Sequence, residues 1–286
     1  MHFRARWLLA AIVICCAGVS AEPLSPLFPQ TRTTCLGTQY SVRPAWDEII
    51  DNLVVRLRKQ IQQGRSNKKR IVYISLPLNS HNGGVRAFNK FLGSEMKQAL
   101  LNRYPQSELE IILPGQIETE LLPFNGESAS GGEYLYMWTQ VLMGENCQGT
   151  IDWIYYMDHR DVVSLLKLSP DAPRNDLSNY LDELAHDSPA VYGDIARDND
   201  KRAAFLNYYL HHYSPDSSKG MRDEWNMVQW VSGCYSSKPR IQQHINGRWT
   251  RDSQPLLDCG YQLLENHCKP HLQTVPADYD QHELSY

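Results

Sequence analysis

The hydrophobic pattern of the chain switches repeatedly between helical and strand-like segments. Between residues 45 and 63, Ile49, Leu53, Leu57 and Ile61 recur at a spacing typical of one helix face. The next segment, IVYISLPL (71–78), is short and apolar nearly throughout, as expected of a strand covered on both faces. The alternation continues, with helices predicted over 85–103, 133–143 and 161–168 and strands over 109–115 and 150–158.

Alternating strands and helices are the pattern of an α/β protein, in which helices connect parallel strands. We therefore predict a mostly parallel sheet with helices on both faces, in three layers. The region 171–213 is less regular: residues 177–185 and 200–209 fit helices, although FLNYYLHHY also fits a strand. Few periodic positions follow Lys238, which predicts an irregular C-terminal tail.

The first residues have the three-part pattern of a secretory signal. MHFRAR is basic, WLLAAIVICC is apolar, and AGVSA supplies small residues before a cleavage site after Ala21. An uncleaved anchor is the alternative, but a membrane span needs about 20 apolar residues. We therefore expect a periplasmic or secreted protein with no membrane span after cleavage.

The predicted organisation has four parts. A signal peptide over residues 1–21 is followed by a proline-rich, extended lead-in over 22–44. The α/β domain covers 45–238, and the tail over 239–286 packs on it. The formal net charge is −4, and loss of Arg4 and Arg6 with the signal would make the chain more acidic. No long basic run is present, which argues against nucleic acid as a partner.

An exported protein can form disulfides, and the predicted mature chain has an odd number of cysteines. They are Cys35, Cys147, Cys234, Cys259 and Cys268. Cys259 and Cys268 are close in sequence and form the favoured bridge, while Cys35 could tie the lead-in to the body. The chain has no CxxC pair, no HExxH and no glycine-rich phosphate motif, so no metal or cofactor is expected.

Ligands of open α/β sheets bind beyond the carboxyl ends of the strands, which directs attention to loops there. The loop NSHNGG follows the first predicted strand, and its glycines allow close backbone approach to a ligand. Asn79, His81, Asn82 and Gly83 are therefore candidate substrate-binding residues. The alternative is a polar turn that starts the next helix.

The loop DHRD follows the third predicted strand. Asp158 is placed to point into a crevice and is a candidate catalytic acid or base. Asp161 is better explained as a cap of the following helix. His159 is expected at the surface.

The stretch SSKGMRDEWNMVQW (217–230) combines two acids with two tryptophans. A helix that starts near Gly220 would place Asp223 and Glu224 in its first turn, where the helix dipole favours carboxylates. Glu224 would also border an apolar face, and burial there would raise its pKa toward that of a general acid or base. Glu224 is thus a candidate catalytic residue, with Asp223, Trp225 and Asn226 as candidate substrate-binding residues.

Two of these segments together resemble nucleoside 2-deoxyribosyltransferases and related N-glycosidases. The similarity lies in the strand and loop ISLPLNSHNGG and in Gly220 four residues before Glu224. It implies that Glu224 is a nucleophile attacking the anomeric carbon of a nucleoside and that Asp158 acts on the base. The chain departs from the family where Trp225 and Asn226 stand in place of the usual Glu-x-Gly that follows the nucleophile.

Two functions follow as hypotheses. The first is an exported hydrolase or transferase that acts on the N-glycosidic bond of a nucleoside or nucleotide, with a carboxylate nucleophile. The second is a non-enzymatic exported protein that binds a small ligand or a partner protein, because no complete catalytic motif is present and fold class does not fix function.

Overall fold

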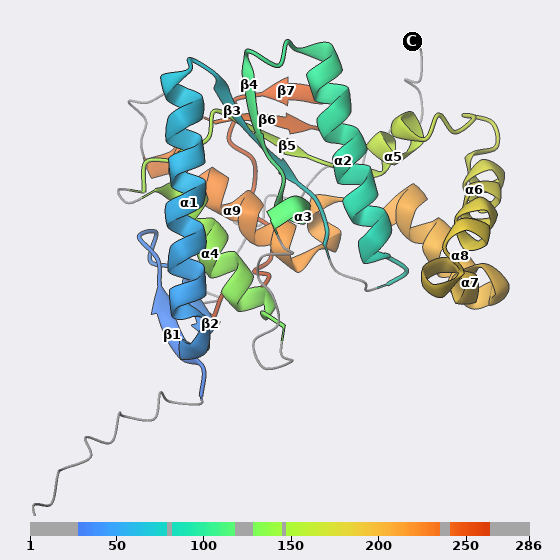
Figure 1. Cartoon of the computed structure of the whole chain (residues 1–286), viewed down its shortest axis with the longest axis horizontal. Coiled ribbons are helices and arrows are strands. Elements are labelled where there is room, and N and C mark those ends of the chain that lie inside the picture. The colour runs from blue at the N-terminus through green and yellow to red at the C-terminus, as the bar shows by residue number, and fades with distance from the viewer. Residues whose placement is uncertain (1–27, 79–81, 118–127, 145–146, 235–240, 264–286) are drawn as a thin grey trace, which may run out of the picture.

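The computed structural model describes residues 28–78, 82–117, 128–144, 147–234 and 241–263, with residues 232–234 as backbone. At its centre lies a five-stranded sheet in the order β4-β3-β5-β6-β7 (Figure 1). The strands are β3 (Arg70–Ser75), β4 (Leu109–Ile112), β5 (Trp153–Tyr156), β6 (Gln242–Ile245) and β7 (Arg248–Thr250). Neighbours from β4 to β6 run parallel, and β7 is antiparallel to β6. The predicted α/β class with a mostly parallel sheet is confirmed.

Alternate residues of each strand pack into two separate hydrophobic clusters, because successive side chains of a strand point to opposite faces. Tyr73 and Tyr156 belong to a cluster shared with α1 (Asp47–Ser66), α4 (Gly131–Met143) and α9 (Lys219–Cys234). Ile74 and Tyr155 belong to the other, shared with α2 (Arg86–Arg103) and α5 (His159–Leu165). The predicted helices 45–63, 85–103, 133–143 and 161–168 correspond to α1, α2, α4 and α5, and a short helix α3 (Pro114–Ile117) follows β4.

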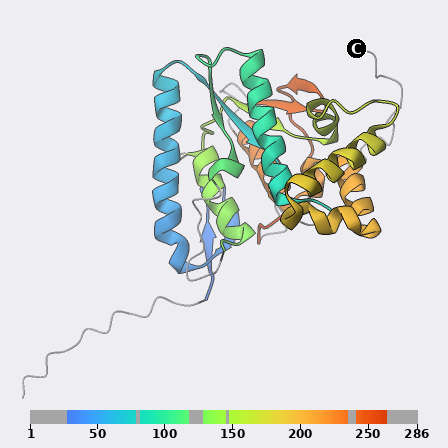
Figure 2. The same ribbon diagram turned by 45° about the vertical axis from the view of Figure 1, so that its right-hand side comes forward.

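The irregular region before α9 is helical. It forms α6 (Pro173–Asp187), α7 (Pro189–Arg197) and α8 (Asn199–Asn207), which group together at one side of the molecule (Figures 1 and 2). FLNYYLHHY is therefore not a strand: it ends α8 and continues as a π-helical turn over Tyr208–His212. A 3-10 turn over Pro215–Ser217 then leads into α9.

Part of the predicted irregular tail belongs to the sheet. β6 lies beside β5, and a turn at Asn246 and Gly247, both with positive φ, returns the chain as β7. The sequence QQHI of β6 has little hydrophobic character, so it gave no strand signal. It is a strand because β5 offers it a parallel edge, which is a tertiary effect.

The lead-in contains an antiparallel hairpin of β1 (Gln30–Thr33) and β2 (Gln39–Val42), followed by a 3-10 turn over Pro44–Trp46. A disulfide between Cys35 in this hairpin and Cys147 after α4 ties the lead-in to the body, as the sequence suggested for Cys35. Cys259 is also disulfide-bonded, and Cys268, its predicted partner, lies outside the described residues.

The strand order reverses beside β3. The chain passes from β3 to β4 on one side, and then to β5 on the other side of β3. The carboxyl ends of β3 and β5 therefore form the topological switch point, where ligands of such sheets bind. Within the described ranges, no helix is both long enough and apolar enough to cross a membrane.

Candidate active site

Glu224 lies in the second turn of α9, because this helix begins at Lys219. The predicted place in the first turn is wrong, and the dipole effect, confined to the ends of a helix, does not explain this acid. The predicted buried face is confirmed, since Met221, Trp225 and Val228 are all buried. Glu224 itself is 5% exposed. It is a buried carboxyl group that needs partners inside the protein.

Those partners come from the strand at the switch point. The Tyr73 hydroxyl donates to Oε1 of Glu224 at 2.6 Å, and the Ser75 hydroxyl donates to Oε2 at 2.5 Å. Tyr73 and Ser75 are two residues apart on β3, so they point to the same face, toward α9. Each carboxylate oxygen thus has its own donor, which fixes the plane of the group. Ser75 is the last residue of β3, so this network lies at the carboxyl end of the strand.

Burial dominates the electrostatics of this carboxyl group. It raises the pKa of Glu224 from its usual 4.5 to about 7. The hydrogen bonds from Ser75 and Tyr73 act in the opposite direction, because they favour the ionised form, and the negative charge of Asp223 adds to the rise. The result is a group that changes charge near neutral pH, which is a feature of many catalytic acids and bases.

Aromatic rings surround the network. Tyr73 contacts Trp138 of α4 edge-on, with 5.1 Å between ring centroids, and Tyr156 of β5 contacts Trp225 at 4.9 Å. Trp138 is fully buried, and its Nε1 has no hydrogen-bond partner within the described part of the chain. These rings form part of the buried cluster around the network, and burial is the largest cause of the raised pKa of Glu224.

Asp223, Trp225 and Asn226 contact the C-terminal strap, which we define as residues 252–263. Asp223 accepts hydrogen bonds from the backbone N–H groups of Gly260 and Tyr261 at 2.7 and 2.6 Å. Burial raises the pKa of Asp223 to about 6. Its observed contacts are therefore with the chain itself.

The other two residues hold the same strap. The amide of Asn226 donates to the backbone oxygen of Leu257 and accepts from its N–H. The indole N–H of Trp225 donates to the backbone oxygen of Pro255 at 2.8 Å. These contacts explain why polar residues follow Glu224 on a buried helix face: they anchor a segment with little regular structure.

Asp158 is the N-cap of α5. Its side chain accepts from the backbone N–H of Arg160, and Asp161 accepts from the backbone N–H of Asp158 to complete a capping box. Asp161 thus takes part in capping, as predicted, but the N-cap residue itself is Asp158. No hydrogen bond or ion pair joins Asp158 to Glu224 among the described residues.

Several ionisable side chains lie around this helix cap. Burial and the charge of Asp158 raise the pKa of Asp161 to about 7, and the Tyr155 hydroxyl donates to Asp161 at 2.7 Å. The His244 ring stacks on Tyr155 with 4.0 Å between centroids, and burial lowers its pKa to about 4. His159, expected at the surface, is half-buried. Among the described residues, no group of three or more His, Cys, Asp or Glu side chains is arranged to hold a metal ion.

The NSHNGG loop is described from Asn82 onward, while Asn79 and His81 lie outside the described residues. Asn82 and Gly83 both have positive φ, 56° and 96°. A Cβ on Gly83 would lie 2.2 Å from the backbone oxygen of Ala204 in α8. This glycine therefore permits close packing of the loop on α8, and Asn82 is exposed.

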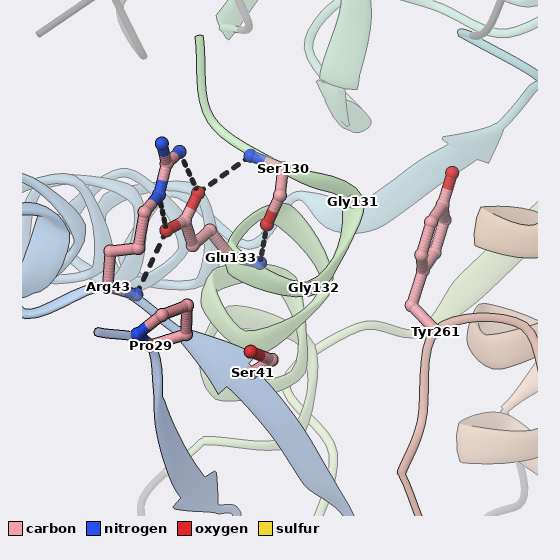
Figure 3. Close-up of a pocket in the computed structure, with 8 residues that line it drawn as sticks. All are labelled: Pro29, Ser41, Arg43, Ser130, Gly131, Gly132, Glu133 and Tyr261. Atoms are coloured by element: carbon pink, nitrogen blue, oxygen red, sulfur yellow. Dashed lines mark hydrogen bonds and ion pairs between the residues drawn. The ribbon is translucent and has the colours of Figure 1, made fainter. Parts of the chain in front are cut away.

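A cavity of about 450 Å³ lies near the start of α4 (Figure 3). Its lining residues are Pro29, Ser41, Arg43, Ser130, Gly131, Gly132, Glu133 and Tyr261. They come from the N-terminal hairpin region, from the first turn of α4 and from the C-terminal strap. The sequence does not predict this cavity, because its lining comes from three segments that are far apart in the sequence and become neighbours only when the chain folds.

Sequence reasoning also missed Tyr73 and Ser75. A signal was available, because both have polar atoms at alternate positions of an otherwise apolar strand. Their shared face, and the helix opposite it, required the structure. Comparison of the chain with protein-family models, with curated proteins and with solved structures finds no match.

Proposed function

We propose that the protein is an exported hydrolase or transferase of N-glycosidic bonds in nucleosides or nucleotides, built on a three-layer α/β scaffold. The observation that carries this proposal is the arrangement at Glu224. A buried carboxyl group with a pKa of about 7 is held between the hydroxyls of Tyr73 and Ser75, beside the switch point of the sheet. The proposal also draws on the resemblance of ISLPLNSHNGG, and of Gly220 with Glu224, to N-glycosidases.

In the proposed reaction, an ionised oxygen of Glu224 attacks the anomeric carbon of the sugar. The bond from this carbon to the base nitrogen breaks, and its electron pair leaves with the base, which takes a proton from an acid such as Asp158. Water or a second base then attacks the same carbon, loses a proton and releases the Glu224 carboxylate. Tyr73 and Ser75 orient the nucleophile throughout, one hydroxyl for each oxygen.

The test is release of free base from adenosine, 2′-deoxyadenosine, inosine and NAD, followed by chromatography. We expect turnover by the native protein, a loss of about a thousandfold or more in Glu224→Gln, and a smaller loss in Tyr73→Phe. The matched control is Glu110→Gln, which removes a half-buried carboxylate on β4 that accepts a hydrogen bond from the amide of Gln60 in α1. Full activity in a folded Glu224→Gln protein would rule out the nucleophile.

A pH profile tests the role of the charge. Because the attacking form of Glu224 is ionised, kcat/KM should rise with pH and level off above about 7. A rate that falls as pH rises through 7 would instead make Glu224 a proton donor.

A second proposal is an exported protein that binds a small ligand or a partner protein without catalysis. One observation favours it: Asp223, Trp225 and Asn226 form hydrogen bonds with the C-terminal strap. These polar groups are therefore engaged in holding the fold and are not free to bind a substrate. Ligand binding to the nucleoside panel without any release of base would support it. N-terminal sequencing of the exported protein tests cleavage after Ala21 and the proposed periplasmic or secreted location.

A further inference from the structure

The cavity at the start of α4 has a size and a lining suited to a small molecule. Its volume of about 450 Å³ falls in the usual range for ligand pockets, about 300–1,000 Å³. Such pockets combine apolar or aromatic walls with a few polar groups that orient the ligand. In Figure 3 the aromatic ring of Tyr261 stands on one side, and Arg43 and Glu133 lie together on the other.

The two charged residues of the lining neutralise each other. Arg43 donates from Nε to Oε1 of Glu133 and from the guanidinium to Oε2, both at 2.7 Å, and it also donates to the backbone oxygen of Ser128. Burial opposes ionisation of Glu133, but the hydrogen bonds and charge of Arg43 lower its pKa below the usual value. Glu133 is therefore ionised and already paired. Neither charge of the lining is therefore left unpaired for a strongly anionic or cationic ligand.

Two glycines of the lining let neighbouring segments pack closely on the first turn of α4. A Cβ on Gly131 would lie 2.2 Å from the ring of Tyr261, and one on Gly132 would lie 2.8 Å from the backbone oxygen of Ser41. Side chains at these positions would therefore collide with the walls. The hydroxyls of Ser41 and Ser130 add neutral polar groups to the lining. Ser130 accepts from the backbone N–H of Glu133, so its own hydrogen is directed elsewhere.

Contacts with α9 fix the position of Tyr261. Asp223 accepts from its backbone N–H at 2.6 Å, and the ammonium of Lys219 lies 5.7 Å from the ring centroid. Lys219 is not one of the eight lining residues. An aromatic ring near neutral hydroxyls and a closed ion pair suits a ligand ring with apolar C–H groups on its face and hydroxyls at its edge.

We propose that this cavity binds a neutral sugar ring, with Tyr261 stacked on the face of the sugar and Ser41, Ser130 and the Arg43–Glu133 pair bonded to its hydroxyls. This site is separate from the Glu224 network and does not rest on the proposed enzymatic function. It would hold a saccharide whether or not the protein cleaves one.

The experiment is ligand-observed NMR on the folded, disulfide-intact protein, with D-glucose, D-ribose and maltose as neutral probes. Glucuronate and glucosamine are the charged counterparts, and adenine is the aromatic one. We expect at least one neutral sugar to bind with a Kd on the order of 1 mM, and the charged sugars and adenine to bind more weakly. Absence of neutral-sugar binding, or tighter binding of a charged sugar or of adenine, would overturn the assignment.

Variants then place the site. Tyr261→Ala should weaken binding of the neutral sugar about tenfold. The matched control is Leu263→Ala, two residues further along the same strap, where the side chain is exposed and outside the lining; binding should be unchanged. Ser41→Ala provides a second, milder change if Tyr261→Ala does not fold, and it should also weaken binding. Equal affinity in the native protein and in the folded cavity variants would refute the proposal.

Discussion

Replacement of Glu224 by Gln isolates the energetic effect of burying an ionisable group in the core. The pKa of Glu224 is raised from 4.5 to about 7, mainly by burial. Below pH 4.5 both the folded and the unfolded chain hold the proton, and the group makes no pH-dependent contribution. Between pH 4.5 and 7 the unfolded chain loses the proton while the folded chain keeps it, so rising pH favours unfolding.

The size of this effect follows from the shift. A pKa raised from 4.5 to about 7 corresponds to about 3 kcal/mol of stability that is present at low pH and lost by pH 8. Gln cannot ionise, so the variant lacks this loss. Its amide oxygen can accept from Tyr73, and the Ser75 hydroxyl can rotate to accept from its NH₂ group, so the packing should survive. We expect the variant to gain about 3 kcal/mol relative to the native protein between pH 4 and pH 8.

Urea unfolding at a series of pH values, followed by tryptophan fluorescence with the disulfides intact, measures this difference. Other shifted groups, such as Asp161 and His244, affect both proteins alike and largely cancel. Tyr73→Phe is the companion variant: it removes a donor that lowers the pKa of Glu224, so the loss of stability should move to higher pH. A difference between Glu224→Gln and native protein that stays constant from pH 4 to 8 would refute the reasoning.

Three further predictions concern the scaffold. Gly83→Ala should destabilise the fold by more than about 2 kcal/mol in urea unfolding, because its Cβ would collide with the backbone of Ala204. Gly37→Ala is the control: Gly37 also has a positive φ but lies in open space, so the change should cost about 1 kcal/mol. Equal costs for the two variants would contradict the packing argument. Replacing Cys35 and Cys147 together by Ser should lower the free energy of unfolding by about 3–5 kcal/mol, because the disulfide closes a loop with a sequence separation of 112. An unchanged urea midpoint would show that the disulfide does not constrain the unfolded chain. Asn226→Ala removes both hydrogen bonds to Leu257, so hydrogen exchange should accelerate at the strap and not in β3, and uniform acceleration would indicate general destabilisation instead.

Local patterns predicted those parts of the fold that are set by short-range physics. The helices at α1, α2 and α4 have apolar positions on one face, and the strand IVYISLPL is apolar nearly throughout, because each element must present apolar surface to the core whatever lies opposite. The buried face of Met221, Trp225 and Val228 was predictable for the same reason. The polar strand β6 was not, because its pairing with β5 supplies what its sequence lacks.

Part of the candidate site was likewise predictable from the sequence, and part was not. The sequence singled out Glu224 through its apolar neighbours, but it did not identify Tyr73 and Ser75, which are about 150 residues away in sequence and bond to both carboxylate oxygens. It also suggested ligand contacts for Asp223 and Asn226, and the hydrogen bonds of both residues to the C-terminal strap were not predictable. A hydrogen-bond partner for a buried polar group can come from any part of the chain, so residue type alone does not reveal it.

By itself, then, the sequence determined the α/β class, the succession of the main helices and strands, and the buried face that contains Glu224. Tertiary structure decided the order of strands in the sheet, the partners of Glu224, and the meeting of Arg43, Gly131 and Tyr261 around one cavity. The physical reason is range: periodicity and capping act within a few turns of chain, whereas burial, pKa and cavity shape depend on contacts between residues far apart in sequence.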